Sequence, residues 1–405
     1  MLQKPLGKKL IVNGQRIYHL RKPFPPDLVY LRIGFRVGSR DDTVWGISHL
    51  LEHMLFKGTG TRTWEQINRD LAYLGAFINA ETGREYTVFY ITVLKDQFEK
   101  AAAILADILL NSTFPKNEFD KEKDVVKNEI FRSIDSVNAY GFDRAHAHYF
   151  SDDLGHPILG TPETVKGTTL DELIRFRDMF YTRENSVIAA VGDISRQSLL
   201  RVVKKHFSFP HGTISRTLQK QTFRAKRVSE TRSNMQNSLV IYRWPGLAMR
   251  HHDTAAYEIL RGILGGGMNS LLHREIREKL GLAYGINART RYHQDVGYFA
   301  ITSQINETNL NRYHRTVLRI LTDLCERGVD KDDFISSKNQ LELAIRQDEE
   351  SGFYLCNSQC IRYLFELPSF EEFTSQLRAV KRSKVKSLAR SVFKSKPFRY
   401  ILTPA

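Results

Sequence analysis

The sequence predicts an α+β fold in two homologous domains, each a mainly antiparallel sheet layered with helices. Three observations support this prediction. The chain has 405 residues, which is longer than a single hydrophobic core usually supports. Two domains of about 200 residues are therefore expected. Strand-like runs alternate with amphipathic helical segments, and turn residues bound most of these runs. The order of segments in the first half then recurs in the second half.

Apolar and β-branched residues mark the strand-like runs. These runs are 28–37, 86–94, 186–191, 238–242 and 297–304. The first and fourth alternate, or nearly alternate, apolar with polar residues. Such alternation favours half-buried strands of an antiparallel sheet over the continuous apolar strands of a doubly wound parallel sheet.

An internal repeat with an offset of about 215 residues relates the two halves. The matching helical segments are 96–109 with 311–324 and 117–129 with 332–344. The offset aligns Glu122 with Ser337 and Glu129 with Ala344. A site that uses these two carboxylates therefore belongs to the first half alone.

Composition places the domain boundaries. Pro210 and Gly212 close the first repeat, and a stretch rich in Lys, Arg, Thr and Gln follows. We predict a first domain over residues 1–212, a basic linker over 213–234 and a second domain over 235–405.

The motif His49-Leu50-Leu51-Glu52-His53 indicates a metal site. Residues four apart lie on one face of a helix, so both imidazoles can reach one ion, with Glu52 beside them. His-x-x-Glu-His is the inverted form of the zincin motif. Ser48 and the segment 41–43 supply capping side chains, and apolar neighbours predict that the helix is buried. The alternative is a helix with two satisfied histidines and one solvated glutamate.

A catalytic zinc ion usually takes three protein ligands, so a third ligand is expected from another segment. Glu129 is a candidate, because its neighbours form the apolar stripe of an amphipathic helix. Glu122 lies two turns earlier on roughly the same face and suits a supporting carboxylate. Taken alone, each of these glutamates also fits a solvated charge.

Seven stretches in order resemble the pitrilysin and insulysin family of metallopeptidases, in the compact branch that includes the catalytic subunit of mitochondrial processing peptidase and its bacterial relatives. They are 37–41, 49–59, 79–87, 121–130, 155–161, 191–193 and 274–284. The resemblance implies one Zn²⁺ per chain bound by His49, His53 and Glu129. It also implies that Glu52 is the general base and that Glu122 supports the site.

The second half has no counterpart of these metal ligands, yet it holds Arg277 and Tyr284. A helix ending at Gly281 would let the chain turn and bring Tyr284 near Arg277. The resemblance implies that both side chains reach across to the zinc domain, where they bind substrate carbonyls and the developing oxyanion. Without it, both would be interpreted as surface residues.

The resemblance also implies how a peptide is held. Asn79 and Ala80 precede a predicted strand, and the corresponding edge strand in the family pairs with an extended peptide. Phe77 would line the pocket just past the scissile bond. A core position is the alternative for Phe77.

Charge is unevenly distributed along the chain. Residues 1–200 hold 26 Lys+Arg and 26 Asp+Glu, so the whole net charge of +15 lies in residues 201–405. A basic face can bind nucleic acid, an anionic membrane or an acidic polypeptide, or can simply be solvated. No nucleic-acid-binding motif accompanies the charge, so we expect an acidic peptide or acidic partner subunit instead.

Three cysteines, Cys325, Cys356 and Cys360, form a sparse and odd set that predicts reduced thiols. No apolar stretch reaches the length of a membrane span or a signal peptide. The expected location is the bacterial cytoplasm, with an organellar matrix as the alternative.

These observations predict a zinc endopeptidase of the processing or peptide-maturation type, which cuts extended peptides in a chamber between its two halves. Glu52 would take a proton from a zinc-held water and pass it to the leaving amine. The alternative is a non-catalytic scaffold or binding subunit of a peptidase complex. By resemblance, the chain is expected to form a homodimer or to pair with a degenerate homologue.

Overall fold

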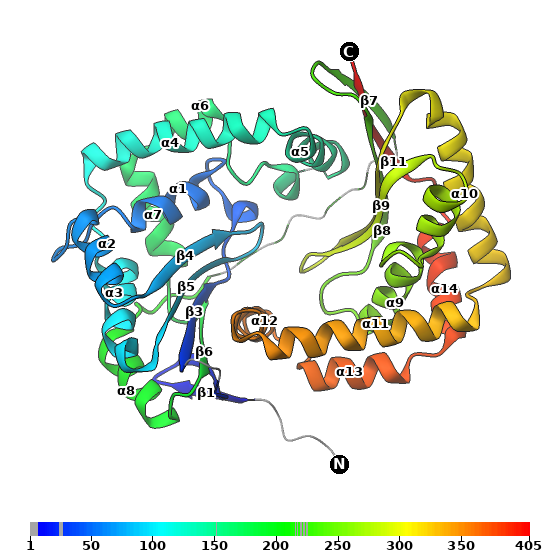
Figure 1. The fold of residues 1–405 in the computed structure, drawn as a ribbon. Coiled ribbons are helices and arrows are strands. Elements are labelled where there is room, and N and C mark those ends of the chain that lie inside the picture. Colours follow the sequence, from blue (N-terminus) through cyan, green and yellow to red (C-terminus); the bar gives the residue numbers. More distant parts are fainter. Residues whose placement is uncertain are drawn as a thin grey trace. The chain divides into compact units, whose positions relative to one another are not determined.

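The computed structural model describes residues 7–23, 27–150, 152–214, 216, 218, 221, 223 and 226–405. They form two compact units (Figure 1). Unit 1 comprises Met1–Ser133, His156–Thr217 and Asp348–Leu367, and unit 2 comprises Ile134–Gly155, Leu218–Gln347 and Pro368–Ala405. The units are interleaved along the chain, so they do not coincide with the continuous ranges 1–212 and 235–405. Part of the predicted linker 213–234 lies outside the described residues.

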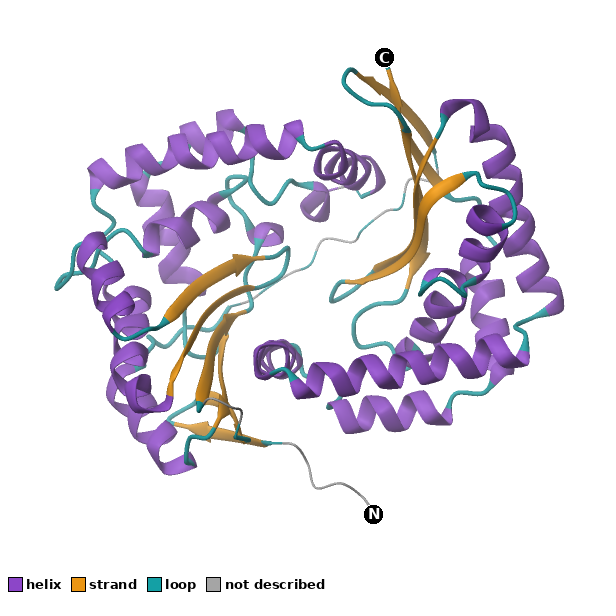
Figure 2. Ribbon diagram, in the orientation of Figure 1, coloured by secondary structure: helices purple, strands orange, loops and turns teal. Residues whose placement is uncertain are grey.

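Unit 1 is built on a six-stranded sheet with the order β1-β2-β6-β3-β5-β4. Strands are drawn in orange in Figure 2. Its strands are β1 (Lys8–Val12), β2 (Gln15–Arg21), β3 (Leu28–Phe35), β4 (Phe77–Thr82), β5 (Thr87–Leu94) and β6 (Ser186–Gly192). Only the β2–β6 pair is parallel, and the other neighbours are antiparallel. Strand β4 therefore forms one edge of the sheet.

Helices cover one face of this sheet. They are α1 (Ile47–Leu55), α2 (Trp64–Tyr73), α3 (Phe98–Asn111), α4 (Lys116–Asp135), α6 (Pro162–Gly167), α7 (Leu170–Phe180) and α8 (Arg196–His206). Their apolar side chains share one core with alternate residues of the strands, such as Ile33, Phe89 and Ile188. This alternation is the period-two pattern of strands that bury one face against helices.

Unit 2 is built on a five-stranded sheet with the order β7-β11-β8-β10-β9. Its strands are β7 (Arg227–Arg232), β8 (Ser238–Gly246), β9 (Ala283–Tyr292), β10 (Gly297–Ile305) and β11 (Phe398–Pro404). Only β7 and β11 run parallel. The series β9-β10-β8 repeats the series β4-β5-β3 of unit 1, so β9 is the edge that corresponds to β4.

The helices of unit 2 repeat those of unit 1 in part. They are α5 (Val137–Tyr149), α9 (Thr254–Gly265), α10 (Leu310–Arg327), α11 (Lys331–Glu350), α13 (Phe370–Ala379) and α14 (Arg382–Phe393), with a π-helical segment at His273–Glu278. Helices α9, α10 and α14 share a core with Tyr242, Phe299 and Ile301 on one face of the sheet. Helix α5 packs on the other face, against Ile241, Tyr298 and Ala300.

Each half of the sequence gives one helix to the unit built mainly from the other half. Helix α5 follows α4 but belongs to unit 2, and α12 (Gly352–Leu364) follows α11 but belongs to unit 1. A buried arginine fixes each helix to its sheet. Arg32 on β3 donates to the Phe353 carbonyl of α12 (3.3 Å), and Arg243 on β8 donates to the Phe142 carbonyl of α5 (3.5 Å). The two contacts are counterparts in the repeat.

The predicted fold class, an α+β architecture in two similar parts, is confirmed. The five predicted strands correspond to β3, β5, β6, β8 and β10. Strands β1, β2, β4, β7, β9 and β11 were not predicted. In the edge strands among them, mostly polar outward side chains weaken the apolar pattern. Asn79 and Ala80 lie inside β4 rather than before a strand, which corrects their predicted placement.

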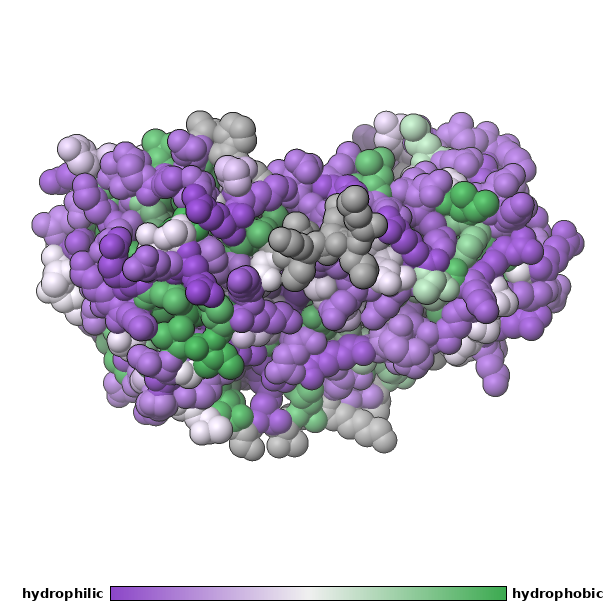
Figure 3. Space-filling model, turned by 90° about the horizontal axis from the view of Figure 1, so that it is seen from below, coloured by the Kyte–Doolittle hydropathy of each residue, from purple (hydrophilic) through white to green (hydrophobic). Residues whose placement is uncertain are grey.

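The surface seen in Figure 3 is mostly hydrophilic, with separate hydrophobic patches. Within the described ranges, no helix has both the length and the apolar character needed to cross a bilayer. Cys356 and Cys360 lie on the buried face of α12, and burial raises the pKa of the Cys356 thiol to about 12. All three cysteines are free thiols.

Candidate metal centre

Helix α1, which carries both histidines of the motif, begins at a glycine cap held by Asp42. Gly46 has φ +91°, and a Cβ there would lie 2.6 Å from the Leu159 carbonyl oxygen. The Asp42 carboxylate accepts hydrogen bonds from the amides of Gly46 (2.7 Å) and Ser48 (3.2 Å) and from the Ser48 hydroxyl. Burial raises the pKa of Asp42 to about 8, against the opposing effect of these hydrogen bonds. The predicted capping by this segment thus acts through Asp42.

The donor atoms of His49, His53 and Glu129 converge. Nε2 of His49 and Nε2 of His53 lie 3.7 Å and 3.6 Å from Oε2 of Glu129. These separations exceed the roughly 2.9 Å of an N–H···O hydrogen bond. They are close to the roughly 3.3 Å that separates two ligands of a tetrahedral zinc ion with bonds near 2.0 Å. The arrangement fits an ion better than direct contact.

The protonation state of His49 also suits a metal ligand. Burial, and next the neighbouring His53, lower the pKa of His49 to about 3, so its ring is neutral at physiological pH. A neutral imidazole has the free lone pair that a metal requires. Nδ1 of His49 is buried and has no hydrogen-bond partner among the described residues. A ligating histidine usually donates its other ring N–H, so Nε2 of His49 faces Glu129 without the orienting bond that Glu122 gives to His53.

Glu122 orients His53 and is itself held by Lys57. Oε1 of Glu122 accepts from Nδ1 of His53 (2.8 Å), and its Oε2 lies 2.6 Å from Nζ of Lys57. Burial alone would raise the pKa of Glu122, but the bonds from His53 and Lys57 outweigh it and lower the pKa. A carboxylate that accepts the Nδ1 proton leaves Nε2 of His53 free to bind metal. Lys57 was not among the predicted site residues, although it follows the motif by one helical turn.

We predict that Lys57→Met weakens zinc binding about 10-fold, because Glu122 loses the cation that holds it against His53. Lys57→Arg should keep most of the affinity, since the charge remains. Competition against a chelating dye measures both constants. Equal zinc affinity of the Met variant and the unaltered chain would show that Lys57 does not act on the metal site.

Glu52 lies beside the histidines and accepts a hydrogen bond from the Thr82 hydroxyl at the end of β4. Burial raises the pKa of Glu52, while Thr82 and then His53 act in the opposite direction. The hydrogen bond fixes one carboxylate oxygen, which leaves the other available for proton transfer. Thr82 was missed by the sequence reasoning, although it lies three residues after Asn79 in a stretch that carries the family resemblance.

Three predicted substrate-binding residues lie on the edge strand β4. The side chains of Phe77 and Asn79 point to solvent, whereas Ala80 is buried. Phe77 is 55% exposed, so it is not a core residue. The neighbouring hairpin is held by a buried ion pair between Arg40 and Glu85 (2.8 Å). This support fixes the end of β4 close to α1.

Arg277 and Tyr284 come together within unit 2. The Arg277 guanidinium lies 5.0 Å from the centre of the Tyr284 ring. Gly281 has φ +59° and makes the turn between them, as predicted. Nη1 of Arg277 also lies 3.0 Å from Nε2 of His273, a residue that the sequence reasoning missed. Both belong to the π-helical segment, a distortion that often occurs at functional sites.

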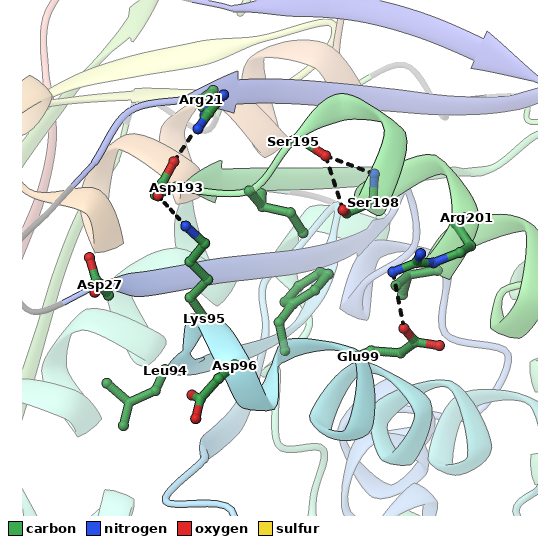
Figure 4. Close-up of a pocket in the computed structure, with 13 residues that line it drawn as sticks. Arg21, Asp27, Leu94, Lys95, Asp96, Glu99, Asp193, Ser195, Ser198 and Arg201 are labelled. Atoms are coloured by element: carbon green, nitrogen blue, oxygen red, sulfur yellow. Dashed lines mark hydrogen bonds and ion pairs between the residues drawn. The ribbon is translucent and has the colours of Figure 1, made fainter.

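A cavity of about 750 Å³ in unit 1 contains none of the predicted site residues (Figure 4). Five of its seven charged side chains bind one another. Arg21 and Lys95 both pair with Asp193, and Arg201 lies 3.5 Å from Glu99. Such mutually neutralised pairs are typical of surface structure rather than of a reactive site.

A second histidine cluster, His251, His252 and Asp253, brings three possible ligand atoms together in unit 2. Two of these possible metal ligands, Asp253 and His251, already have partners within the protein. Lys384 lies 2.7 Å from the Asp253 carboxylate, and the Asp253 amide donates to Nδ1 of His251 (3.1 Å). The cluster therefore fits a metal less well than His49, His53 and Glu129.

Comparison with known proteins agrees with the site. Residues 22–162 match the family model described as insulinase (peptidase family M16), and residues 168–341 match the model described as peptidase M16 inactive domain. The chain is 32% identical over 391 residues to YmxG of Bacillus subtilis, described as an uncharacterized zinc protease, with 94% of each chain covered. A protein of Rickettsia bellii with the same description is 28% identical over 404 residues, covering 97% of this chain and 96% of that one.

Solved structures share the fold over the whole chain. The crystal structure of a protease from Helicobacter pylori superposes with a TM-score of 0.90 at 20% identity and covers 99% of this chain and 100% of that one. That of a peptidase M16 inactive domain from Pseudomonas fluorescens gives a TM-score of 0.91 at 20% identity, with 98% of each chain covered. The family resemblance found in the sequence is confirmed. The chain belongs to the insulinase family of peptidases, peptidase family M16.

Proposed function

We propose that this chain is a zinc-dependent endopeptidase that binds one Zn²⁺ and cuts extended peptides. The observation that carries the proposal is that Nε2 of His49 and Nε2 of His53 both lie 3.6–3.7 Å from Oε2 of Glu129. Two imidazoles and one carboxylate are the ligand set of many catalytic zinc ions. The zinc proteases among its relatives support this interpretation.

Each residue of the site has a proposed task. Zinc, when bound, would act as a Lewis acid that polarises the scissile carbonyl. The free oxygen of the Glu52 carboxylate takes a proton from the attacking water and gives it to the leaving nitrogen. Thr82 holds the other oxygen of Glu52 in place. Glu122 and Lys57 keep His53 in the tautomer whose Nε2 is free.

The substrate is proposed to bind as an added strand. Strand β4 is an edge of its sheet and ends beside Glu52. Backbone hydrogen bonds to such an edge accept many sequences, and alternate side chains confer preference. Asn79 and Ala80 would bind the peptide backbone, and the exposed ring of Phe77 would contact the side chain just past the cut.

Arg277 and Tyr284 are proposed to bind the same peptide and its developing oxyanion. We expect Arg277→Ala and Tyr284→Phe to lower cleavage about 10²–10³-fold, because each removes a donor to developing charge. Zinc content and thermal stability should stay unchanged, since neither residue is a metal ligand. Unaltered turnover numbers in both variants would exclude this role.

The competing function is a non-catalytic subunit, and one finding favours it in part: residues 168–341 match a domain model described as inactive. That stretch holds none of the metal ligands, whereas the first half retains all of them. A homodimer or a pair with a degenerate homologue remains proposed, as does a bacterial cytoplasmic location.

Metal analysis and peptide cleavage by the purified chain test the proposed function. We expect about one zinc per chain, loss of cleavage after treatment with 1,10-phenanthroline, and recovery on addition of Zn²⁺. Gel filtration of the same sample reports on self-association. A chain that binds zinc yet cuts no member of a quenched-fluorescence peptide library would be a binding subunit instead.

A further inference from the structure

A groove of about 520 Å³ in unit 2 lies between α5 and the strands β9 and β10. Six amide side chains line it, and its lining contains no carboxylate. The amides belong to Asn138, Asn237, Asn287, Gln304, Asn306 and Asn309. Amide groups both donate and accept, so the groove offers hydrogen bonds in each sense. Phe142, Leu239 and Leu282 add apolar surface beside these amides, so the groove suits an extended segment with both polar and apolar groups.

The groove exists because one helix covers only part of this face of the sheet. Asn287 and Arg289 stand opposite Thr302 and Ala300 and point to the side on which α5 packs. Both are nevertheless exposed, since α5 lies over β8 and β11 rather than over the edge strand. The free edge of β9 therefore forms one border of the groove.

The only charged side chain in the lining is Arg289. Its guanidinium lies 5.6 Å from the centre of the Phe142 ring on α5, which orients it along the groove wall. Among the described residues it forms no ion pair with a carboxylate. An oriented, unneutralised guanidinium amid amides is a receptor for a carboxylate, which it can bind through two parallel hydrogen bonds.

The groove also reaches Tyr284. The pairing of β9 with β10 slips between Ala283 and Ile286, so Tyr284 and Gly285 together face Gln304. A bulge of this kind turns a side chain out of the regular alternation. Tyr284 is 87% exposed there and lines the groove with Gly281 and Gly285.

We propose that this groove is a subsite for a carboxylate-bearing segment of the peptide substrate, with Arg289 as the residue that selects it. The proposal rests on the proposed function, because it assigns a substrate class to the same enzyme. The carboxylate belongs either to an Asp or Glu side chain or to the peptide's C-terminus. Either source presents the same two oxygens to the guanidinium.

Binding measured without turnover tests the proposal. The protein is the full chain with Glu52→Gln, alone or with Arg289→Gln. The probes are three fluorescein-labelled peptides of one length: one with two internal Asp and an amidated end, one with Asn in their place and an amidated end, and one with Asn and a free C-terminal carboxylate. Fluorescence anisotropy gives each dissociation constant.

We expect Arg289→Gln to weaken at least one carboxylate peptide about 10-fold or more, as loss of a charge-assisted hydrogen bond should. The amidated Asn peptide should change less than about 2-fold. The peptide that responds identifies the source of the carboxylate. Arg291→Gln is the matched control, because Arg291 is also an exposed arginine on β9 but lies outside the groove. A second variant, Asn287→Asp, should weaken the same peptide by repulsion.

Equal weakening of all three peptides, or the same effect from Arg291→Gln, would reduce the groove to a general basic surface and overturn the proposal. If the chain cuts peptides but Arg289 has no selective effect, the proposed function survives and the subsite fails. If Arg289 selects carboxylates in a chain that never cuts, the subsite survives as part of a binding protein.

Discussion

Replacement of Glu52 by Gln is expected to lower peptide cleavage by at least about 10²-fold while the chain keeps its zinc. Glutamine has nearly the same shape and can still accept the hydrogen bond from Thr82, but it cannot take a proton from water. Initial rates on a quenched-fluorescence peptide give the effect on turnover, and metal analysis of the same sample gives zinc content.

Glu65→Gln is the matched control for this variant. Glu65 is an exposed glutamate in the first turn of α2, and its replacement should leave turnover nearly unchanged. Near-normal cleavage by the Glu52 variant would show that another group moves the proton. A loss of zinc together with activity would instead make Glu52 part of the metal's support.

Replacement of Glu129 by Gln is expected to remove zinc and activity together. Oε2 of Glu129 faces both histidine nitrogens, and a neutral amide is a far weaker ligand for zinc than a carboxylate. Glu122→Gln should act more weakly, on the order of 10- to 100-fold, because Glu122 reaches the metal only through His53. Zinc per chain after dialysis, measured beside the cleavage rate, distinguishes the two variants.

Asp124→Asn provides the control on the same helix. Asp124 is exposed and pairs with Lys127 at 2.8 Å, so zinc and turnover should both be preserved. Full zinc occupancy in the Glu129 variant would place the third ligand elsewhere and leave Glu129 as a solvated charge.

Much of the site could be predicted because it depends on local periodicity. The four-residue spacing of His49 and His53 determines that they share a helical face, and Gly281 permits the turn that brings Tyr284 to Arg277. Lys57 and Thr82 could not be predicted in this way. Their roles depend on contacts with Glu122 and Glu52, which lie 65 and 30 residues away in the sequence.

Contacts between distant segments also limited what could be predicted of the fold. The repeat predicted two similar sheets with helices, and five strands were recognised from their apolar content, whereas the largely buried strands β2 and β11 were not. Which sheet α5 or α12 covers could not be predicted. An amphipathic helix shows that one face is buried, but not which partner buries it.

The exchange of α5 and α12 has a consequence for how the chain emerges from the ribosome. The sheet of unit 1 presents Arg32 and Gly34 to α12, which is translated more than 300 residues later. A nascent chain that has passed residue 215 already carries both histidines and Glu129, yet one face of its sheet is still bare. At this stage α5 also lacks its packing partners, because strands β8, β10 and β11 have not yet been translated. The peptidase half should therefore stay dependent on chaperones, and sensitive to proteases, until synthesis is nearly complete.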